Sequence, residues 1–276
     1  MIATALGVVV GLVLGLTGAG GSILAVPLLM AGLGWGLRQA APVALLAVCA
    51  AATFGTVTAW DATYIRYRAA ILMALVGFIA APFGLRVAAV LPVATLTLLF
   101  AGVIVIVAVR MLVQARRAPA EAGVVRATVA GDALPATGKL LRLDRHGRIA
   151  WNATAIAAIS GIGAVTGFTS ALLGVGGGFI IVPSLRAVSP LSMHSAVATS
   201  LMAIALTSAG TVAIAALQGA TIPWMQAAPF GAGALAGMLA GRQLAPRVAG
   251  AHLQQAFATL MLLVAAGMAL GAARQG

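Results

Sequence analysis

The chain has 276 residues, of which 62% are hydrophobic and 7% are charged, and its formal net charge is +12. Soluble domains are about 45–50% apolar and about 25% charged, so this chain has too few polar side chains to cover a soluble fold. Disorder is excluded because disordered chains are poor in apolar residues, and a disulfide scaffold is excluded because Cys49 is the only cysteine. The composition predicts an all-α, polytopic integral membrane protein.

The positive charge is distributed in a way that favours membrane topology over nucleic-acid binding. The basic residues lie at the ends of apolar runs and in one central segment, and they do not form a single basic face. Lys and Arg mark cytoplasmic loops of membrane proteins. We therefore expect the lipid bilayer, and no nucleic acid, as a partner.

The first charge-free segment, residues 1–37, is too long for one straight crossing. As continuous helix it would extend roughly 55 Å, whereas a bilayer core is about 30 Å thick. A glycine cluster and a proline interrupt it in the stretch GLTGAGGSILAVPLL, from Gly15 to Leu29. The segment is either a broken crossing helix or a hairpin that returns to its starting side. Because the first basic residue is Arg38, the N-terminus does not resemble a cleaved signal peptide.

Three spans are predicted next, near residues 40–60, 69–90 and 93–113. A linker, 114–150, then carries a concentration of positive charge that places it in the cytoplasm. Its basic residues are Arg116, Arg117, Arg126, Lys139, Arg142, Arg145 and Arg148. A second long charge-free segment follows at 149–185, and three further spans are predicted near 195–217, 224–244 and 252–272.

The second long segment repeats the pattern of the first. It reads ALLGVGGGFIIVPSL from Ala171 to Leu185, and its glycines and proline match those of the first cluster at an offset of 156. Two later matches, at offsets of 155 and 157, keep the same order. We predict two homologous membrane repeats, 1–113 and 151–276, joined by the linker. Transporters are often built from such repeats, with the substrate site at the repeat interface.

Positive charges bear on whether the two long segments cross or return. If both cross, the linker side carries 11 Lys and Arg residues and the opposite side 5; if both return, the counts become 13 and 3. The second arrangement follows the positive-inside rule better and makes the two halves inverted relative to each other. The sequence favours hairpins without excluding crossings.

The glycine clusters are predicted to unwind the helix and expose main-chain N–H groups to an anion. A helix N-terminus carries about half a positive charge and binds anions. The predicted binding residues are Thr17, Gly18, Gly20, Gly21 and Ser22 in the first cluster and Gly174, Gly176, Gly177 and Gly178 in the second. Pro27 and Pro183 would fix the half-helices that follow. The alternative is that these glycines serve only close helix packing.

Packing alone is the prediction for two other glycine sets, which recur every four residues. They are Gly7, Gly11 and Gly15 in the first half and Gly233, Gly237 and Gly241 in the second.

The scarcity of acidic residues favours an anion as the ligand. Asp61 is the only acidic residue outside the linker, no His, Cys, Asp or Glu group has metal spacing, and no nucleophile–base pair stands out. We therefore expect no enzyme activity, no cofactor and no metal site. Arg38 and Arg186 are candidates for steering an anion, and His194, Ser195, Thr199, Ser200, Thr207 and Ser208 offer further polar groups.

The two clusters, together with MHSAVATSL from Met193 to Leu201, resemble the sulfite exporter TauE/SafE family over nearly the whole chain. The resemblance implies export of sulfite, an organosulfonate or a related sulfur or carboxylate anion across the bacterial inner membrane. It also implies that His194, Thr199 and Ser200 contribute to the substrate site. The first half departs from the family pattern, because Val43 and Ala44 stand where Thr and Ser are usual.

The predicted function is transport of a small anion by alternating access. The alternative is a non-transporting membrane partner, such as an assembly factor for a redox enzyme. The sequence leaves the cargo, the coupling ion and the oligomeric state open.

Overall fold

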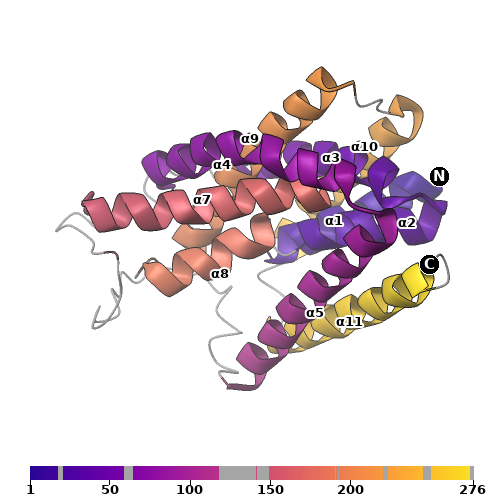
Figure 1. Cartoon of the computed structure of the whole chain (residues 1–276). Helices are drawn as coiled ribbons and strands as arrows, with labels where there is room; N and C mark the ends of the chain where they lie inside the picture. Colours follow the sequence, from indigo (N-terminus) through magenta and orange to yellow (C-terminus); the bar gives the residue numbers. More distant parts are fainter. Residues whose placement is uncertain are drawn as a thin grey trace.

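The computed structural model describes residues 1–17, 21–58, 65–117, 141, 149–189, 191, 193–219, 223–244 and 250–273. These residues form ten α-helices and confirm the all-α prediction (Figure 1). The helices of the first half are α1 (Ile2–Thr17), α2 (Ser22–Leu33), α3 (Leu37–Thr58), α4 (Tyr67–Val90) and α5 (Val93–Arg117). Those of the second half are α7 (Ala153–Leu173), α8 (Gly178–Val188), α9 (Met193–Leu217), α10 (Trp224–Leu244) and α11 (Gly250–Ala273).

Five described helices are long and apolar enough to cross a membrane: α3, α4, residues 93–110 of α5, α7 and residues 195–217 of α9. The predicted spans near 224–244 and 252–272 coincide with α10 and α11, which are not among these five. Helix α5 runs to Arg117 and so extends past residue 113, where the first repeat was predicted to end. Most of the linker lies outside the described residues.

The chain doubles back at both glycine clusters. A Cβ placed on Gly21 would lie 2.6 Å from the Cα of Leu14, and one on Gly32 would lie 2.5 Å from a methyl group of Leu6. The start of α2 therefore lies beside the end of α1, and the end of α2 lies beside the start of α1. In the second half, a Cβ on Gly177 would lie 3.1 Å from the carbonyl oxygen of Thr166, so the chain also turns back onto α7. These contacts show a turn at each cluster, and whether the two segments cross the membrane or return stays a prediction.

The two glycine sets with a spacing of four pack against each other, as predicted. Helix α1 crosses α10 so closely that a Cβ on Gly15 would lie 2.6 Å from the carbonyl oxygen of Met238. In the opposite direction, a Cβ on Gly237 would lie 2.7 Å from the amide nitrogen of Leu12. Only glycine permits this backbone approach, which is the small-residue packing typical of membrane helices.

A second crossing of the same kind joins α4 to α7. A Cβ on Gly77 would lie 3.1 Å from the carbonyl oxygen of Gly163, and one on Gly163 would lie 2.5 Å from the carbonyl oxygen of Met73. The first helix of each half thus crosses the fourth helix of the other half. Two homologous halves would produce this reciprocal arrangement, although the repeat itself stays a prediction from the sequence.

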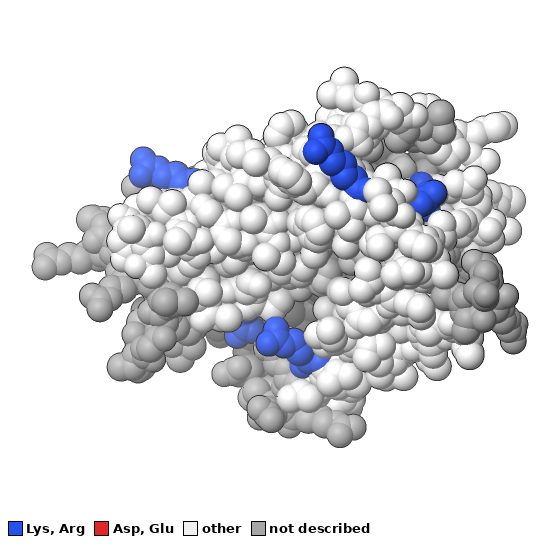
Figure 2. All heavy atoms as spheres, viewed as in Figure 1, with Lys and Arg blue, Asp and Glu red and all other residues white. Residues whose placement is uncertain are grey.

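Helices α3 and α9 lie at the centre, between the two crossings. They are the most buried of the five candidate spans, and the thiol of Cys49 donates to the carbonyl oxygen of Ala205 across them at 3.5 Å. The outer surface is largely uncharged, with a few separate Lys and Arg side chains on the face that Figure 2 shows. No described residue is acidic. An apolar outer surface suits contact with lipid.

Candidate functional site

The second glycine cluster adopts a backbone that favours glycine. Gly174, Gly176 and Gly177 have φ values of +72°, +76° and +68°. This left-handed region costs other L-residues roughly 1–2 kcal/mol each. Helix α7 ends as its C-cap Gly174 donates its N–H to the carbonyl oxygen of Ser170 at 2.8 Å, and α8 begins at Gly178. The helix is therefore broken here, as the sequence predicted.

Neighbouring helices approach the break closely. A Cβ on Gly174 would lie 2.6 Å from the Cα of Ala41 on α3. A Cβ on Gly176 would lie 2.8 Å from the hydroxyl oxygen of Ser208 on α9 and 2.9 Å from Val48 on α3. Helices α3, α7 and α9 therefore pack against the break, and a side chain at either glycine would displace its surroundings.

Five consecutive main-chain N–H groups, those of residues 175–179, take part in no hydrogen bond between residues that the structure describes. The first bonded N–H groups of α8 are those of Ile180 and Ile181, and both donate to the carbonyl oxygen of Gly177, at 3.0 and 3.3 Å. The N-cap, Gly177, has no side chain with which to cap the helix. All five residues are buried. Unsatisfied N–H groups at a buried helix N-terminus form an electropositive site that an anion can occupy.

Two buried hydroxyl groups near the break also have no hydrogen-bond partner among the described residues. They are those of Ser170 and Ser208, both residues with 0% exposure. Ser170 lies one helical turn after Thr166 on the same face of α7, and Thr166 is the residue that Gly177 approaches. Such unpaired groups are rare in protein interiors. The break thus combines main-chain N–H donors with hydroxyls that are free to donate.

Ser170 was not a candidate from the sequence, since it precedes the glycine cluster in a helix where one Ser resembles any other. Ser170 becomes a candidate because the packing of α7 against the start of α8 places its face of α7 beside the break.

The first cluster is described only in part. Gly18 and Gly20, and the side chain of Thr17, lie outside the described residues. Gly21 is the N-cap of α2, and the fully buried Ser22 is the first residue of that helix. Whether this cluster binds an anion stays a prediction.

Of the predicted polar groups on α9, the structure brings Ser208 to the second break, and it does not bring Thr199 and Ser200 there. Thr199 and Ser200 are fully buried, but Thr199 accepts the N–H of Arg66 at 3.0 Å, and Ser200 donates to the carbonyl oxygen of Val197 at 2.8 Å. The residue of α9 beside the break is Ser208, which lies about 12 Å further along the helix than Ser200. His194 lies in the first turn of α9, and its side chain is outside the described residues.

The remaining candidates lie in or after the half-helices. Pro27 lies inside α2 and is buried, and Pro183 lies inside α8 and is exposed. Arg186 is half-buried in the last turn of α8. Their predicted roles remain predictions.

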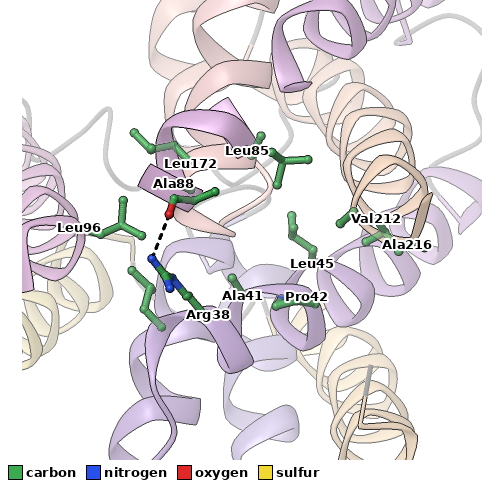
Figure 3. A pocket seen from close by; sticks show the side chains of 14 residues that line it. Arg38, Ala41, Pro42, Leu45, Leu85, Ala88, Leu96, Leu172, Val212 and Ala216 are labelled. Carbon is green, nitrogen blue, oxygen red and sulfur yellow. Dashed lines mark hydrogen bonds between the residues drawn. The ribbon is translucent and has the colours of Figure 1, made fainter. Parts of the chain in front are cut away.

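Arg38 lines a cavity of about 260 Å³ that adjoins the second break (Figure 3). The cavity lies between the N-terminal part of α3, the C-terminal ends of α4, α7 and α9, and the start of α5. Ala41, one of its lining residues, is also the residue that Gly174 approaches. Arg38, the predicted steering residue, therefore lines the same cavity as Ala41, which packs against the predicted anion site at Gly174.

A different arginine, Arg242, contacts the C-terminal end of α3. The Nη1 group of Arg242 on α10 donates to the carbonyl oxygen of Gly55 at 3.0 Å and contacts the hydroxyl of Thr58. Arg38 and Thr58 are separated by about 30 Å along α3, which is roughly the thickness of a bilayer core. The cavity and the Arg242 contact thus lie at opposite ends of a membrane-spanning helix.

Comparisons with known proteins agree with this architecture. The sequence profile described as "Sulfite exporter TauE/SafE" matches residues 3–268. A "Probable membrane transporter protein" of Xylella fastidiosa (strain 9a5c) is 30% identical over 203 residues, which is 72% of this chain and 67% of that protein. A protein of the same description from Xylella fastidiosa (strain Temecula1 / ATCC 700964) is 30% identical over 200 residues, with the same two shares. No solved structure matches significantly.

The chain belongs to the sulfite exporter TauE/SafE family, and it is a multi-pass membrane transporter rather than an enzyme.

Proposed function

We propose that this TauE/SafE family member carries a small anion, such as sulfite, an organosulfonate or a related sulfur or carboxylate anion, outward across the bacterial inner membrane by alternating access. The observation that carries the proposal is the row of buried N–H groups at residues 175–179, beside the hydroxyl of Ser208, none of which bonds to a residue that the structure describes.

Several donors are needed because an anion entering the protein loses its hydration. The effective penalty for burying an ion is several kcal/mol. A hydrogen bond to a charged group contributes about 1.5–3 kcal/mol, so two or three of these donors acting together would offset the penalty. The positive end of α8 adds to their effect without a charged side chain.

The two ends of α3 support alternating access. Arg242 ties α10 to α3 at one end, while a cavity beside Arg38 reaches towards the second break at the other. With the basic linker in the cytoplasm, as the positive-inside rule predicts, Arg38 lies at the outer face. The described conformation would then be the one open to the outside. Outward movement of an anion from a cell that is negative inside releases about 2.3 kcal/mol per charge per 100 mV.

Growth and efflux measurements test the proposal in cells with and without the gene. Cells that express the protein should survive a sulfite load better and release sulfite, or another sulfur or carboxylate anion, faster. The same anion should cross proteoliposomes that contain the purified protein. Absence of flux for every such anion, with normally folded protein, would favour the non-transporting partner.

A variant pair tests the role of the break. Gly176→Leu would force a side chain against Ser208 and Val48, and we expect it to abolish flux. Gly102→Leu is the matched control, because a Cβ on Gly102 meets nothing within 4 Å. Retained flux in Gly176→Leu at normal expression would contradict an anion site at this break.

A further inference from the structure

The cavity beside Arg38 combines one cation with apolar walls. Among the described lining residues, Arg38 is the only polar one, and the others are Leu, Ala, Val and Pro. Leu45, Leu85, Leu96 and Val212 contribute the larger side chains around it (Figure 3). This composition differs from that of the second break, where N–H and hydroxyl groups converge.

Arg38 is held in place and still has donors to offer. Its Nη2 group donates to the carbonyl oxygens of Ala89 and Leu91, at 3.3 and 3.2 Å, where α4 ends. Its Nε and Nη1 groups make no hydrogen bond with any residue that the structure describes. The side chain is exposed, so a solute can reach it from water. A guanidinium fixed on one edge and open on the other can bind a carboxylate or a sulfonate.

The walls select against a fully hydrated inorganic ion. Such an ion would exchange water on all sides for a single guanidinium and hydrocarbon, which leaves most of its hydrogen bonds unreplaced. A molecule with one anionic group and an apolar body would bind Arg38 with the first and bury the second. The volume of about 260 Å³ is just below the range of drug-sized pockets, so the body must be small.

We propose that Arg38 and this cavity bind a small organic monoanion, a sulfonate or carboxylate whose apolar body lies against Leu45, Leu85 and Val212. The inference rests on the proposed function. Ala41 lines the cavity and packs on Gly174 of the second break, so we take the molecule bound in the cavity to be of the same class as the transported anion. It narrows that class to anions with an apolar body.

Binding can be measured without transport, by titration calorimetry of the full chain in nanodiscs of neutral phosphatidylcholine. Hexanesulfonate is the probe, and sulfite and hexylammonium are the comparisons. Hexanesulfonate should bind at least tenfold more tightly than either. Across propane-, butane-, pentane- and hexanesulfonate the affinity should rise by up to about fourfold per methylene. Equal affinities for sulfite and hexanesulfonate would overturn the proposal.

Two variants locate the site. Arg38→Gln should weaken hexanesulfonate binding by about tenfold or more, because it removes a charged hydrogen-bond donor. Ala216→Phe should also weaken binding, because Ala216 lines the cavity and the ring would fill it. Ala213→Phe is the matched control on the same helix, since Ala213 is exposed and is not a lining residue. Unchanged binding in Arg38→Gln, or an equal loss in both Phe variants, would refute the site.

Two further measurements distinguish a bound anion from a bound lipid, and binding from transport. If binding persists in neutral lipid and is lost in anionic phosphatidylglycerol at matched high salt, the cavity takes a lipid and the proposal fails. Intact binding without flux in the wild-type protein would refute transport while retaining the site, so the two failures are distinguishable.

Discussion

Replacement of Ser208 by Ala separates a binding role from a structural one. The Ser208 hydroxyl is fully buried and has no hydrogen-bond partner in the described part of the chain, so it adds no hydrogen bond to the fold there. An unsatisfied buried hydroxyl lowers stability by about 1–3 kcal/mol, so its removal should raise the free energy of unfolding. The small void that the removal leaves lowers stability again by part of that amount. We expect Ser208→Ala to be as stable as the wild-type protein, or more stable by up to about 2 kcal/mol.

Transport should change in the opposite direction. If Ser208 donates to the bound anion, its loss should raise the KM for the anion by about tenfold or more, because a hydrogen bond to a charged group is worth about 1.5–3 kcal/mol. Thermal unfolding in neutral detergent and initial flux in proteoliposomes give the two quantities.

Thr56→Val is the matched control, because the buried Thr56 hydroxyl donates to the carbonyl oxygen of Ala52 at 2.8 Å. It should lose about 1 kcal/mol of stability and leave KM unchanged. The reasoning would be refuted if Ser208→Ala destabilised the protein as much as Thr56→Val, or if its KM stayed at the wild-type value.

The packing and the charges lead to three further predictions. Gly237→Ala should lower the free energy of unfolding by about 1–3 kcal/mol, because its Cβ would overlap the backbone of α1. Gly231→Ala on the same helix meets open space and should be neutral or stabilising. Equal unfolding midpoints for the two variants would contradict the close crossing of α1 and α10. Arg242→Gln should lower the free energy of unfolding by about 1 kcal/mol, because it removes hydrogen bonds between α10 and α3. Arg86→Gln, at an exposed position, should stay within about 0.5 kcal/mol of wild type. A thermal melt that ranks the two variants the other way would show that Arg242 does not hold α10 to this end of α3. A reporter fused after Gly276 should be active outside the cytoplasm, since each half then crosses three times, and cytoplasmic activity would contradict the hairpins.

The sequence predicted the features that depend on regular spacing. The glycines repeated every four residues in α1 and α10 could be identified as packing faces because four residues return to the same side of a helix. The span predicted near 224–244 coincides with α10, since the turn before it is marked by glycine and proline and its end by a charge.

The contacts of individual polar side chains could not be predicted in the same way. Thr199 and Ser200 matched a family pattern, yet their hydroxyls bond to Arg66 and Val197, and Ser208 lies beside the second break. Which hydroxyl of a helix faces a break depends on the register of that helix against its neighbours. That register is set here by the crossings of distant helices, and no local pattern encodes it.

The cavity beside Arg38 illustrates the same limit. Arg38 was a candidate because it follows the first glycine cluster, and the structure brings it near the second cluster instead, through Ala41 and Gly174. Arg38 of the first half lies near the cluster of the second half because the first helix of each half packs on the fourth helix of the other half.

Removal of single main-chain N–H groups tests most directly whether the break binds the anion. An amide-to-ester replacement at Gly178, introduced as the corresponding hydroxy acid, deletes one unpaired N–H and keeps every side chain. The same replacement at Ile180 deletes an N–H that donates to Gly177. We predict that the ester at Gly178 raises the KM for anion flux by about tenfold or more at unchanged stability, and that the ester at Ile180 lowers stability with little effect on KM. An unchanged KM for the ester at Gly178 would contradict anion binding at the break.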